Sequence, residues 1–191
     1  MTTDGGEITG RLLELAVERG AIRYGDFTLS SGRKSAYYFD GRLLSLDPEG
    51  AHLIGNALLP LLADAGVDAI GGPTLGADPI VTAAAMASWQ QGTPLPAFIV
   101  RKEAKGYGMG QMIEGPLPEE ATVAIVDDAC TTGGSLFHAI DAAEAAGCTV
   151  GLVLALLDRN EGGGDAIRQR GYRFETLLTA GEDGRIRPAQ A

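Results

Sequence analysis

Two neighbouring acids and a short loop of small residues carry the clearest chemistry in this sequence. Asp127 and Asp128 end an apolar run that starts at Val123, and a loop of hydroxyls and glycines follows at 131–135. Adjacent carboxylates accept hydrogen bonds from a sugar diol or contact Mg²⁺ through water. Loop hydroxyls and backbone N–H groups at the start of a helix bind phosphate well. The segment therefore predicts a site for a sugar phosphate.

The glycines of this loop belong to neither of two common nucleotide-binding motifs. A Walker loop ends in Gly-Lys-Ser/Thr, whereas Gly133 and Gly134 are followed by Ser135. The dinucleotide fingerprint has no acid pair before its glycines. Here the glycines remove the Cβ atoms that would keep a phosphate away from the backbone.

Alternating strands and helices are expected to place the acid pair at the edge of a sheet. Apolar runs predict strands at 67–70, 97–100, 122–126 and 150–157, and helical patterns fall at 78–89, 134–146 and 164–170. This alternation, with continuous apolar strands, is typical of a mainly parallel, doubly wound α/β sheet. Ligands bind such sheets at the carboxyl ends of the strands, where Asp127 and Asp128 lie.

The first 65 residues predict two long helices and a pair of short strands. The expected elements are a helix over 7–19, strands around 27–29 and 37–39, and a helix from 48 to about 65. Asp47 before Pro48 is typical of a helix N-cap followed by proline at the first helical position. Gly66 is the expected helix stop.

The segment 101–120 interrupts the alternation with a long, glycine-containing loop. It begins with three cations, Arg101, Lys102 and Lys105. Long loops in compact domains are often functional lids. Cations at the start of this loop indicate a functional lid, which would close onto an anionic ligand.

Composition and charge indicate one globular domain and exclude several function classes. The chain has 191 residues, of which 45% are hydrophobic, and a formal net charge of −10. Such a charge disfavours non-specific binding to nucleic acids or anionic membranes. No apolar run approaches the roughly 20 residues that span a bilayer, and the N-terminus lacks signal-peptide features. We expect a cytoplasmic protein without nucleic-acid or membrane partners, and a frayed tail at 181–191.

The run 123–135 resembles the phosphoribosyl-pyrophosphate (PRPP) signature of the type I phosphoribosyltransferases. Other segments resemble the orotate branch of that family, namely 27–39, 71–79, 101–108 and 157–159. They follow the family's order and spacing, and the resemblance covers about residues 10–180. It implies a type I phosphoribosyltransferase-like fold in one domain, 1–191, with a small hood and N-terminal helix in 1–45 and a mobile catalytic loop at 101–120.

The resemblance implies which residues bind PRPP. Asp127 and Asp128 would hold the ribose hydroxyls, Thr131–Ser135 the 5′-phosphate, and the loop at 74–76 the pyrophosphate. The full set implied is Thr74, Leu75, Gly76, Asp127, Asp128, Ala129, Cys130, Thr131, Thr132, Gly133, Gly134 and Ser135. Mg²⁺ is the implied cofactor, bound mainly through PRPP, with the two acids contacting it through water and no direct protein ligand.

Orotate binding and catalysis are implied for residues outside the signature. Thr131, Arg159, Tyr38 and Phe39 are the implied orotate contacts, and a guanidinium presents a bidentate fork to a carboxylate. The implied catalytic residues of the loop are Arg101, Lys102, Lys105 and Tyr107. In the family this loop reaches across a homodimer, so that each active site is shared between subunits.

Two departures from the family pattern concern these sites. Tyr107 stands where the family usually has histidine, and a phenol titrates near pH 10 instead of about 6.5. Ser30 and Gly76 stand where some members have lysine. His52 and His138 lie in predicted helices and are expected to be structural or solvated.

The implied reaction joins orotate to PRPP and gives orotidine 5′-monophosphate and pyrophosphate, in the pathway of pyrimidine biosynthesis. It needs electrostatic stabilisation of the leaving group and no covalent nucleophile. Two other functions stay open at this point. One is a phosphoribosyltransferase for another base, which would share the site at 127–135. The other is a non-enzymatic RNA-binding regulator, which the charge of −10 disfavours.

Overall fold

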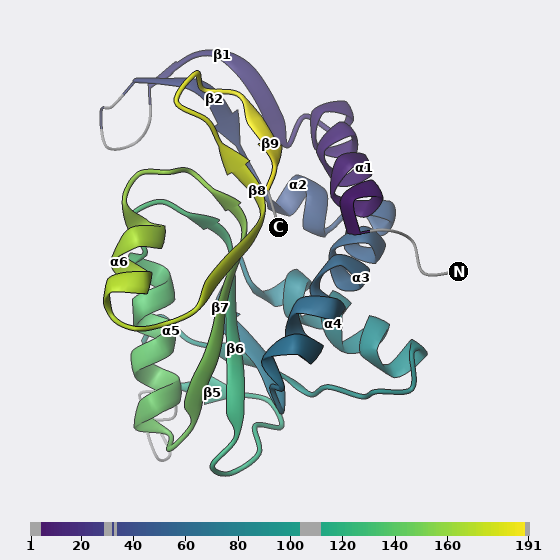
Figure 1. Ribbon diagram of the computed structural model, residues 1–191, viewed down its shortest axis with the longest axis vertical. Coiled ribbons are helices and arrows are strands. Elements are labelled where there is room, and N and C mark those ends of the chain that lie inside the picture. Colours follow the sequence, from purple (N-terminus) through teal and green to yellow (C-terminus); the bar gives the residue numbers. More distant parts are fainter. Residues whose placement is uncertain (1–4, 29–31, 33, 104–111, 190–191) are drawn as a thin grey trace.

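A seven-stranded sheet lies between two layers of helices, and a separate two-stranded hairpin crosses the top of the molecule (Figure 1). The computed structural model describes residues 5–28, 32, 34–103 and 112–189. The helices are α1 (Gly5–Glu18), α2 (Arg42–Ser45), α3 (Pro48–Ala65), α4 (Asp78–Gln90), α5 (Gly134–Ala145) and α6 (Gly163–Gln169). The strands are β1 (Ile22–Thr28), β2 (Lys34–Phe39), β3 (Ala69–Pro73), β4 (Ala97–Val100), β5 (Ile113–Glu114), β6 (Thr122–Cys130), β7 (Thr149–Asp158), β8 (Phe174–Ala180) and β9 (Ile186–Pro188).

The order of the large sheet confirms the predicted doubly wound architecture. Its strands follow the order β5-β4-β3-β6-β7-β8-β9. The strands from β4 to β8 in this order are parallel, and β5 and β9 are antiparallel edges. Parallel strands end at one edge of the sheet, so β3, β6 and β7 deliver their C-terminal residues to the same place.

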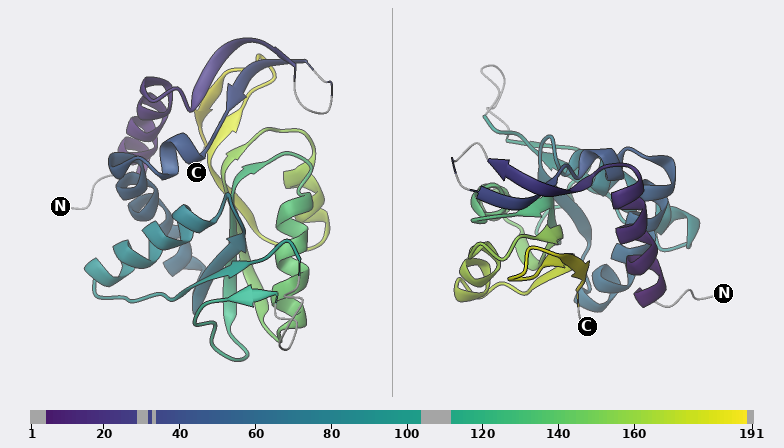
Figure 2. Two further views of the ribbon diagram at one scale, coloured as in Figure 1. Left: turned by 180° about the vertical axis from the view of Figure 1, so that it is seen from behind. Right: turned by 90° about the horizontal axis from the view of Figure 1, so that it is seen from above.

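Each face of the sheet is covered by its own helices, and the strands are therefore apolar on both sides. Leu152 and Leu154 of β7 pack in the cluster that includes α1, α3 and α4. Val153 and Ala155 pack in the cluster that includes α5 and α6. Figure 2 shows the two helical layers from behind and from above. Alternate side chains of a strand point to opposite faces, which explains this division.

Helix α3 begins and ends as the sequence predicts. The Asp47 carboxylate accepts hydrogen bonds from the backbone N–H groups of Glu49 at 3.0 Å and Gly50 at 3.1 Å. Pro48 follows this N-cap, and Gly66 closes the helix in the left-handed conformation, with φ of 62°. These bonds satisfy backbone groups that a helix end otherwise leaves without partners.

The predicted strand boundaries are wrong on three strands of the sheet. The 122–126 prediction ended at the first acid, but β6 continues to Cys130, so Asp127 and Asp128 lie inside the strand. Asp127 pairs with Ala155 of β7, a strand that is also longer than predicted. Strand β3 begins at Ala69 instead of residue 67. Backbone pairing with a neighbour does not stop where the side chains turn polar, and apolar runs do not report it.

The expected frayed tail is also wrong. Strand β9 pairs antiparallel with β8, two elements that the sequence did not predict, and Ile186 is buried. The Ile186 N–H donates to the hydroxyl of Tyr24 in β1 at 3.2 Å, which connects the tail to the hairpin. Helix α2 and strand β5 were likewise not predicted. In the part of the chain that the structure describes, no helix has the length and apolarity to cross a bilayer.

The packing of β3 against β6 makes Gly72→Ala strongly destabilising. A Cβ on Gly72 would press against the carbonyl oxygen of Val126 and lie 2.6 Å from the Ala77 Cβ. Overpacking of this kind costs about 1–3 kcal/mol. Gly10→Ala in α1 is the matched control, because a Cβ there meets no atom of the described residues within 4 Å. Urea unfolding should show a loss for Gly72→Ala and none for Gly10→Ala. Equal stabilities would contradict the close approach.

Candidate active site

The two predicted acids lie side by side near the carboxyl end of β6, where the loop that follows folds back onto them. Asp127 is buried, with 6% of its surface exposed. Ser135 Oγ donates to Asp127 Oδ2 at 2.6 Å, and the Asp128 N–H donates to Asp127 Oδ1 at 2.9 Å. The structure thus brings together the acids and the last residue of the 131–135 loop.

Burial raises the pKa of both carboxyl groups. The pKa of Asp127 rises to about 7, mainly because burial penalises the charged form, and the hydrogen bond from Ser135 opposes this rise. Burial also raises the pKa of Asp128, against the hydrogen bond from the Ala129 N–H and the positive charge of Arg42. Two neighbouring carboxyls of this kind titrate as a pair. Near neutral pH the pair can therefore gain or lose a proton when a ligand arrives.

Two glycines make room for the acid pair. A Cβ on Gly76 would lie 2.6 Å from Asp127 Oδ1 and 2.9 Å from Asp128 Oδ1. A Cβ on Gly41 would lie 2.7 Å from the Asp128 Cβ. The carboxylates occupy the space that a side chain would need. Gly76 therefore fits the acid pair of this chain, because a larger residue would collide with both carboxylates.

The predicted pyrophosphate loop lies beside the acids, at the end of β3. The Thr74 N–H donates to the carbonyl of Val100 at 2.9 Å, and Thr74 Oγ1 donates to Asp78 Oδ2 at 2.9 Å. The peptide bond between Thr74 and Leu75 is cis, and Leu75 is exposed. The loop between β3 and α4 is thus fixed at both ends and lies at the same sheet edge as Asp127.

The 131–135 loop has the geometry of an anion site. Gly133, with φ of 82°, is the N-cap of α5, and no side-chain cap is recorded there among the described residues. The Gly163 N–H donates to the carbonyl of Thr131 at 2.9 Å, which ties the loop to the start of α6. A Cβ on Gly163 would lie 2.6 Å from Cys130 Sγ, so this contact is close. The positive end of a helix dipole with uncapped N–H groups favours phosphate.

Arg159 lies where β7 ends and connects the sheet to the hairpin. Its N–H donates to the carbonyl of Cys130 at 3.0 Å. Its guanidinium donates to Glu161 Oε1 at 3.0 Å and to Ser35 Oγ at 3.5 Å, and its Cζ lies 4.7 Å from the centre of the Tyr37 ring. The side chain is only 8% exposed. Arg159 is thus a buried cation beside the sheet edge that holds the acids.

The sequence missed the residues that surround Arg159. The predicted orotate contacts in β2 are Tyr38 and Phe39, and Tyr38 packs on the Phe27 ring with centroids 5.9 Å apart. Its neighbour Tyr37 is the buried aromatic that lies under Arg159. A period of two along β2 could have separated Tyr37 from Tyr38, because alternate side chains face opposite sides.

The cations of the 101–120 segment are only partly described. The Arg101 N–H donates to the carbonyl of Met112 at 2.8 Å, and its guanidinium lies 3.4 Å from Glu114 Oε1. Lys102 is exposed. His138 Nε2 lies 2.8 Å from the carbonyl oxygen of Arg101, so this histidine contacts the start of the segment. Lys105, Tyr107 and Ser30 lie outside the described residues.

The described residues do not build a closed metal cage. In 5–28, 32, 34–103 and 112–189, no group of three or more His, Cys, Asp or Glu side chains is placed to hold an ion. Asp127 and Asp128 nevertheless offer the oxygen ligands that Mg²⁺ prefers. Mg²⁺ often keeps several waters and binds through one or two carboxylates together with substrate phosphates.

Comparison with known proteins decides among the functions that the sequence left open. No protein-family model matches the chain. The orotate phosphoribosyltransferase of Nostoc sp. is 45% identical over 179 residues, which cover 93% of this chain and 86% of the relative. The crystal structure of the Mycobacterium tuberculosis orotate phosphoribosyltransferase in complex with Fe(III) dicitrate matches with a TM-score of 0.79 and 39% identity, over 90% of this chain and 96% of the other.

A further crystal structure of the Mycobacterium tuberculosis orotate phosphoribosyltransferase, in complex with PRPP, matches with a TM-score of 0.74 and 33% identity, over 91% of this chain and 90% of the other. The predicted type I phosphoribosyltransferase fold is therefore confirmed. The chain belongs to the orotate phosphoribosyltransferase family and is an enzyme of pyrimidine biosynthesis that transfers the phosphoribosyl group of PRPP to orotate.

Proposed function

We propose that the acid pair and the loop that follows it hold the ribose 5-phosphate part of PRPP. Asp127 and Asp128 accept hydrogen bonds from the two ribose hydroxyls. Backbone and hydroxyl groups of the loop Thr131–Ser135 surround the 5′-phosphate at the start of α5, and Ala129 and Cys130 are further PRPP contacts. The uncapped helix N-terminus and the left-handed Gly133 support this assignment.

The pyrophosphate end of PRPP is assigned to the residues at the ends of β3 and β4. Thr74, Leu75 and Gly76 lie under the pyrophosphate, and Arg101, Lys102 and Lys105 neutralise it as it leaves. Lys105 and Tyr107 belong to the same catalytic loop, 101–120. The common sheet edge supports this assignment, because Thr74 bonds to the strand that Arg101 follows. Spreading the charge of the leaving group lowers the barrier to breaking the bond at C1′.

Mg²⁺ is the cofactor that this donor set fits. It would bind mainly through PRPP oxygens, with Asp127 and Asp128 contacting it through water. When bound, it supplies positive charge to the pyrophosphate. The two carboxylates are oxygen donors, and among the described residues no third acidic side chain joins them in a group placed to hold an ion, which suits an ion that keeps its waters.

Base recognition is assigned to Arg159, Thr131, Tyr38 and Phe39. The single observation that carries this proposal is the burial of Arg159 at the sheet edge that also holds the acid pair. Its guanidinium would bind the orotate carboxylate, and the aromatic side chains of β2 would flank the pyrimidine ring. The hairpin that carries them belongs to the hood, residues 1–45, of a single catalytic domain.

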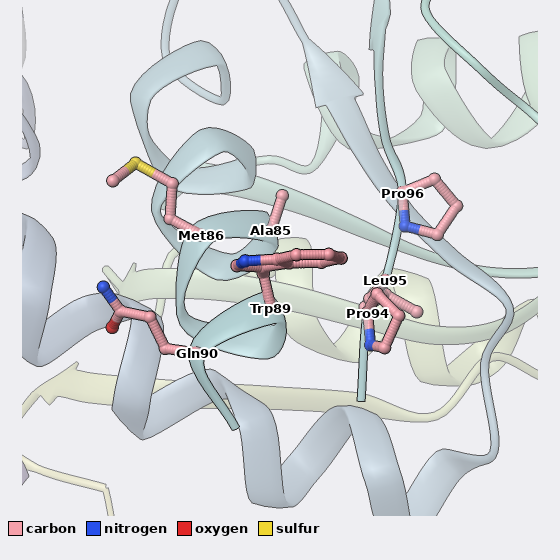
Figure 3. Close-up of a pocket in the computed structure, with 7 residues that line it drawn as sticks. All are labelled: Ala85, Met86, Trp89, Gln90, Pro94, Leu95 and Pro96. Carbon is pink, nitrogen blue, oxygen red and sulfur yellow. The ribbon is translucent and has the colours of Figure 1, made fainter. Parts of the chain in front are cut away.

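An exposed apolar face supports the proposal that the enzyme is a homodimer. Met86 and Trp89 project from α4 beside Pro94–Pro96 and line an open hollow of about 490 Å³ (Figure 3). Trp89 is 74% exposed, and α2, which packs against α4, adds the exposed Leu43. Large exposed apolar patches often mark interfaces. The occupant we propose is a second copy, whose catalytic loop would complete the active site.

A cytoplasmic location stays a prediction from the sequence.

Asp127→Asn is predicted to stabilise the fold and weaken substrate binding. The folded pKa of about 7 exceeds the ordinary value of 3.8, so the wild type loses stability as the pH rises through this window. The uncharged variant does not pay this cost, which is about 4 kcal/mol at pH 8 and about 1–2 kcal/mol at pH 5. Thermal melts at both pH values test this, and PRPP affinity should fall about tenfold. A variant less stable than the wild type at pH 8 would contradict the burial effect.

Arg159→Met is predicted to raise the KM for orotate about 100-fold and to leave the KM for PRPP within about twofold, since a charge-assisted bidentate contact is lost. Loss of orotate absorbance in the presence of Mg²⁺ and PRPP measures the rate. Arg173→Met is the matched control, because Arg173 forms the same Nε contact with a glutamate two residues ahead, on the surface. Equal effects of the two variants would refute the assignment of Arg159.

Trp89→Glu is predicted to shift the protein from dimer to monomer, because a charge at the centre of an apolar interface is not solvated. Sedimentation velocity measures the shift, and activity should fall with the dimer fraction. Gln169→Glu adds a negative charge on α6 and should change neither the dimer fraction nor the activity. A dimeric Trp89→Glu variant would place the interface elsewhere.

A further inference from the structure

Glu161 forms the most buried ion pair recorded among the described residues. Its Oε1 accepts from Arg159 Nε at 3.0 Å, and the two side chains are 12% and 8% exposed. Water competes weakly for such a pair, so its geometry is well held. A buried guanidinium also needs a counter-charge, since an unpaired buried charge is strongly destabilising. Glu161 supplies this charge before any substrate arrives.

Two further groups restrict the same guanidinium. Ser35 Oγ lies 3.5 Å from Arg159 Nη2, and the Tyr37 ring lies on one face, 4.7 Å from Cζ. A guanidinium has five N–H donors. The contacts recorded among the described residues use Nε, Nη2 and one face, and none of them uses Nη1. Glu161 thus holds the Nε side of the guanidinium, while terminal N–H donors remain for another carboxylate.

A second pair in the same chain shows that sequence spacing alone does not create this arrangement. Arg173 Nε donates to Glu175 Oε1 at 3.1 Å, again with a spacing of two residues. Both of these side chains are 40% exposed, and Arg173 also pairs with Asp64 at 2.6 Å. Exposed pairs of this kind contribute little. Burial therefore distinguishes the Arg159–Glu161 pair from the exposed Arg173–Glu175 pair, which has the same spacing.

We propose that Glu161 is a positioning residue for the transfer reaction, which orients Arg159 toward the carboxylate of orotate. The proposal rests on the role assigned to Arg159 above. Glu161 holds the Nε edge, and the Tyr37 ring and Ser35 fix the plane, so the terminal N–H groups are directed before the substrate binds. Preorganised donors bind more tightly because less freedom is lost on binding.

The position of the contact favours positioning over competition with the substrate. If Glu161 competed with an orotate carboxylate bound end-on to Arg159, it would occupy the two terminal nitrogens. It instead contacts Nε, the nitrogen next to the aliphatic stem. The two roles give opposite signs, since removing a competitor lowers the KM for orotate and removing a positioning residue raises it.

Glu161→Ala tests the proposal through the KM values of the two substrates. We expect the KM for orotate to rise about tenfold while the KM for PRPP stays within about twofold. Glu161→Gln should restore the KM for orotate to within about threefold of the wild type, because the amide oxygen still accepts from Nε. An unchanged or lower KM for orotate in Glu161→Ala would overturn the proposal. So would a parallel rise of both KM values, which indicates general damage.

A double-mutant cycle separates this proposal from the role of Arg159. In the Arg159→Met background, Glu161→Ala should raise the KM for orotate no further, because the two residues act through one contact. An undiminished effect in that background would overturn the positioning role. A normal KM for orotate in Arg159→Met would refute the assignment of Arg159 itself. Glu175→Ala, in the matched surface pair, should change neither KM value.

Discussion

The burial of two adjacent carboxyl groups is the constraint on which the rest of the site depends. Asp127 is buried and Asp128 half-buried near the end of a central strand, which pairs with β3 as far as Ile125 and with β7 as far as Cys130. The raised pKa of Asp127, about 7, expresses the free energy that this placement costs. Neighbouring segments accommodate the pair. Gly41 and Gly76 have no side chain that would collide with the carboxyl groups, and Ser135 donates a hydrogen bond to Asp127. The site is therefore built around groups that the folded chain alone stabilises poorly.

The two charged parts of the site differ in how the protein satisfies them. Arg159 has its counter-charge, Glu161, within the protein. The acid pair receives a side-chain donor from Ser135 and backbone donors from Asp128 and Ala129 of its own strand, and no cation within ion-pair distance is recorded for it among the described residues. The acids are thus suited to gain hydrogen-bond donors from a sugar diol, whereas Arg159 is suited to present a fixed fork. The acid pair gains hydrogen-bond donors when the substrate binds, whereas Arg159 offers donors that are already oriented.

Sequence reasoning predicted the parts of this molecule that depend on local chemistry. The caps of α3 at Asp47 and Gly66, the strand–helix alternation and the acid pair follow from residue types and spacing. What depends on distant contacts was missed. Strand β9 forms because Ile186 packs in a core built from residues far away in the chain. Strand β6 continues beyond its apolar residues because β7 pairs with it. The contact of Ser35 with Arg159 joins residues 124 positions apart, which no local pattern reports.

The proton balance of PRPP binding tests the central role of the buried acid pair most directly. Hydrogen bonds from ribose hydroxyls favour the ionised form of Asp127, so its pKa should fall from about 7 and protons should be released near pH 7. Isothermal titration calorimetry in buffers of different ionisation enthalpy counts these protons. The variant Asp127→Asn corrects for protons that PRPP and Mg²⁺ themselves exchange. We expect the wild type to release more protons than the variant. Equal release from both proteins would contradict the account.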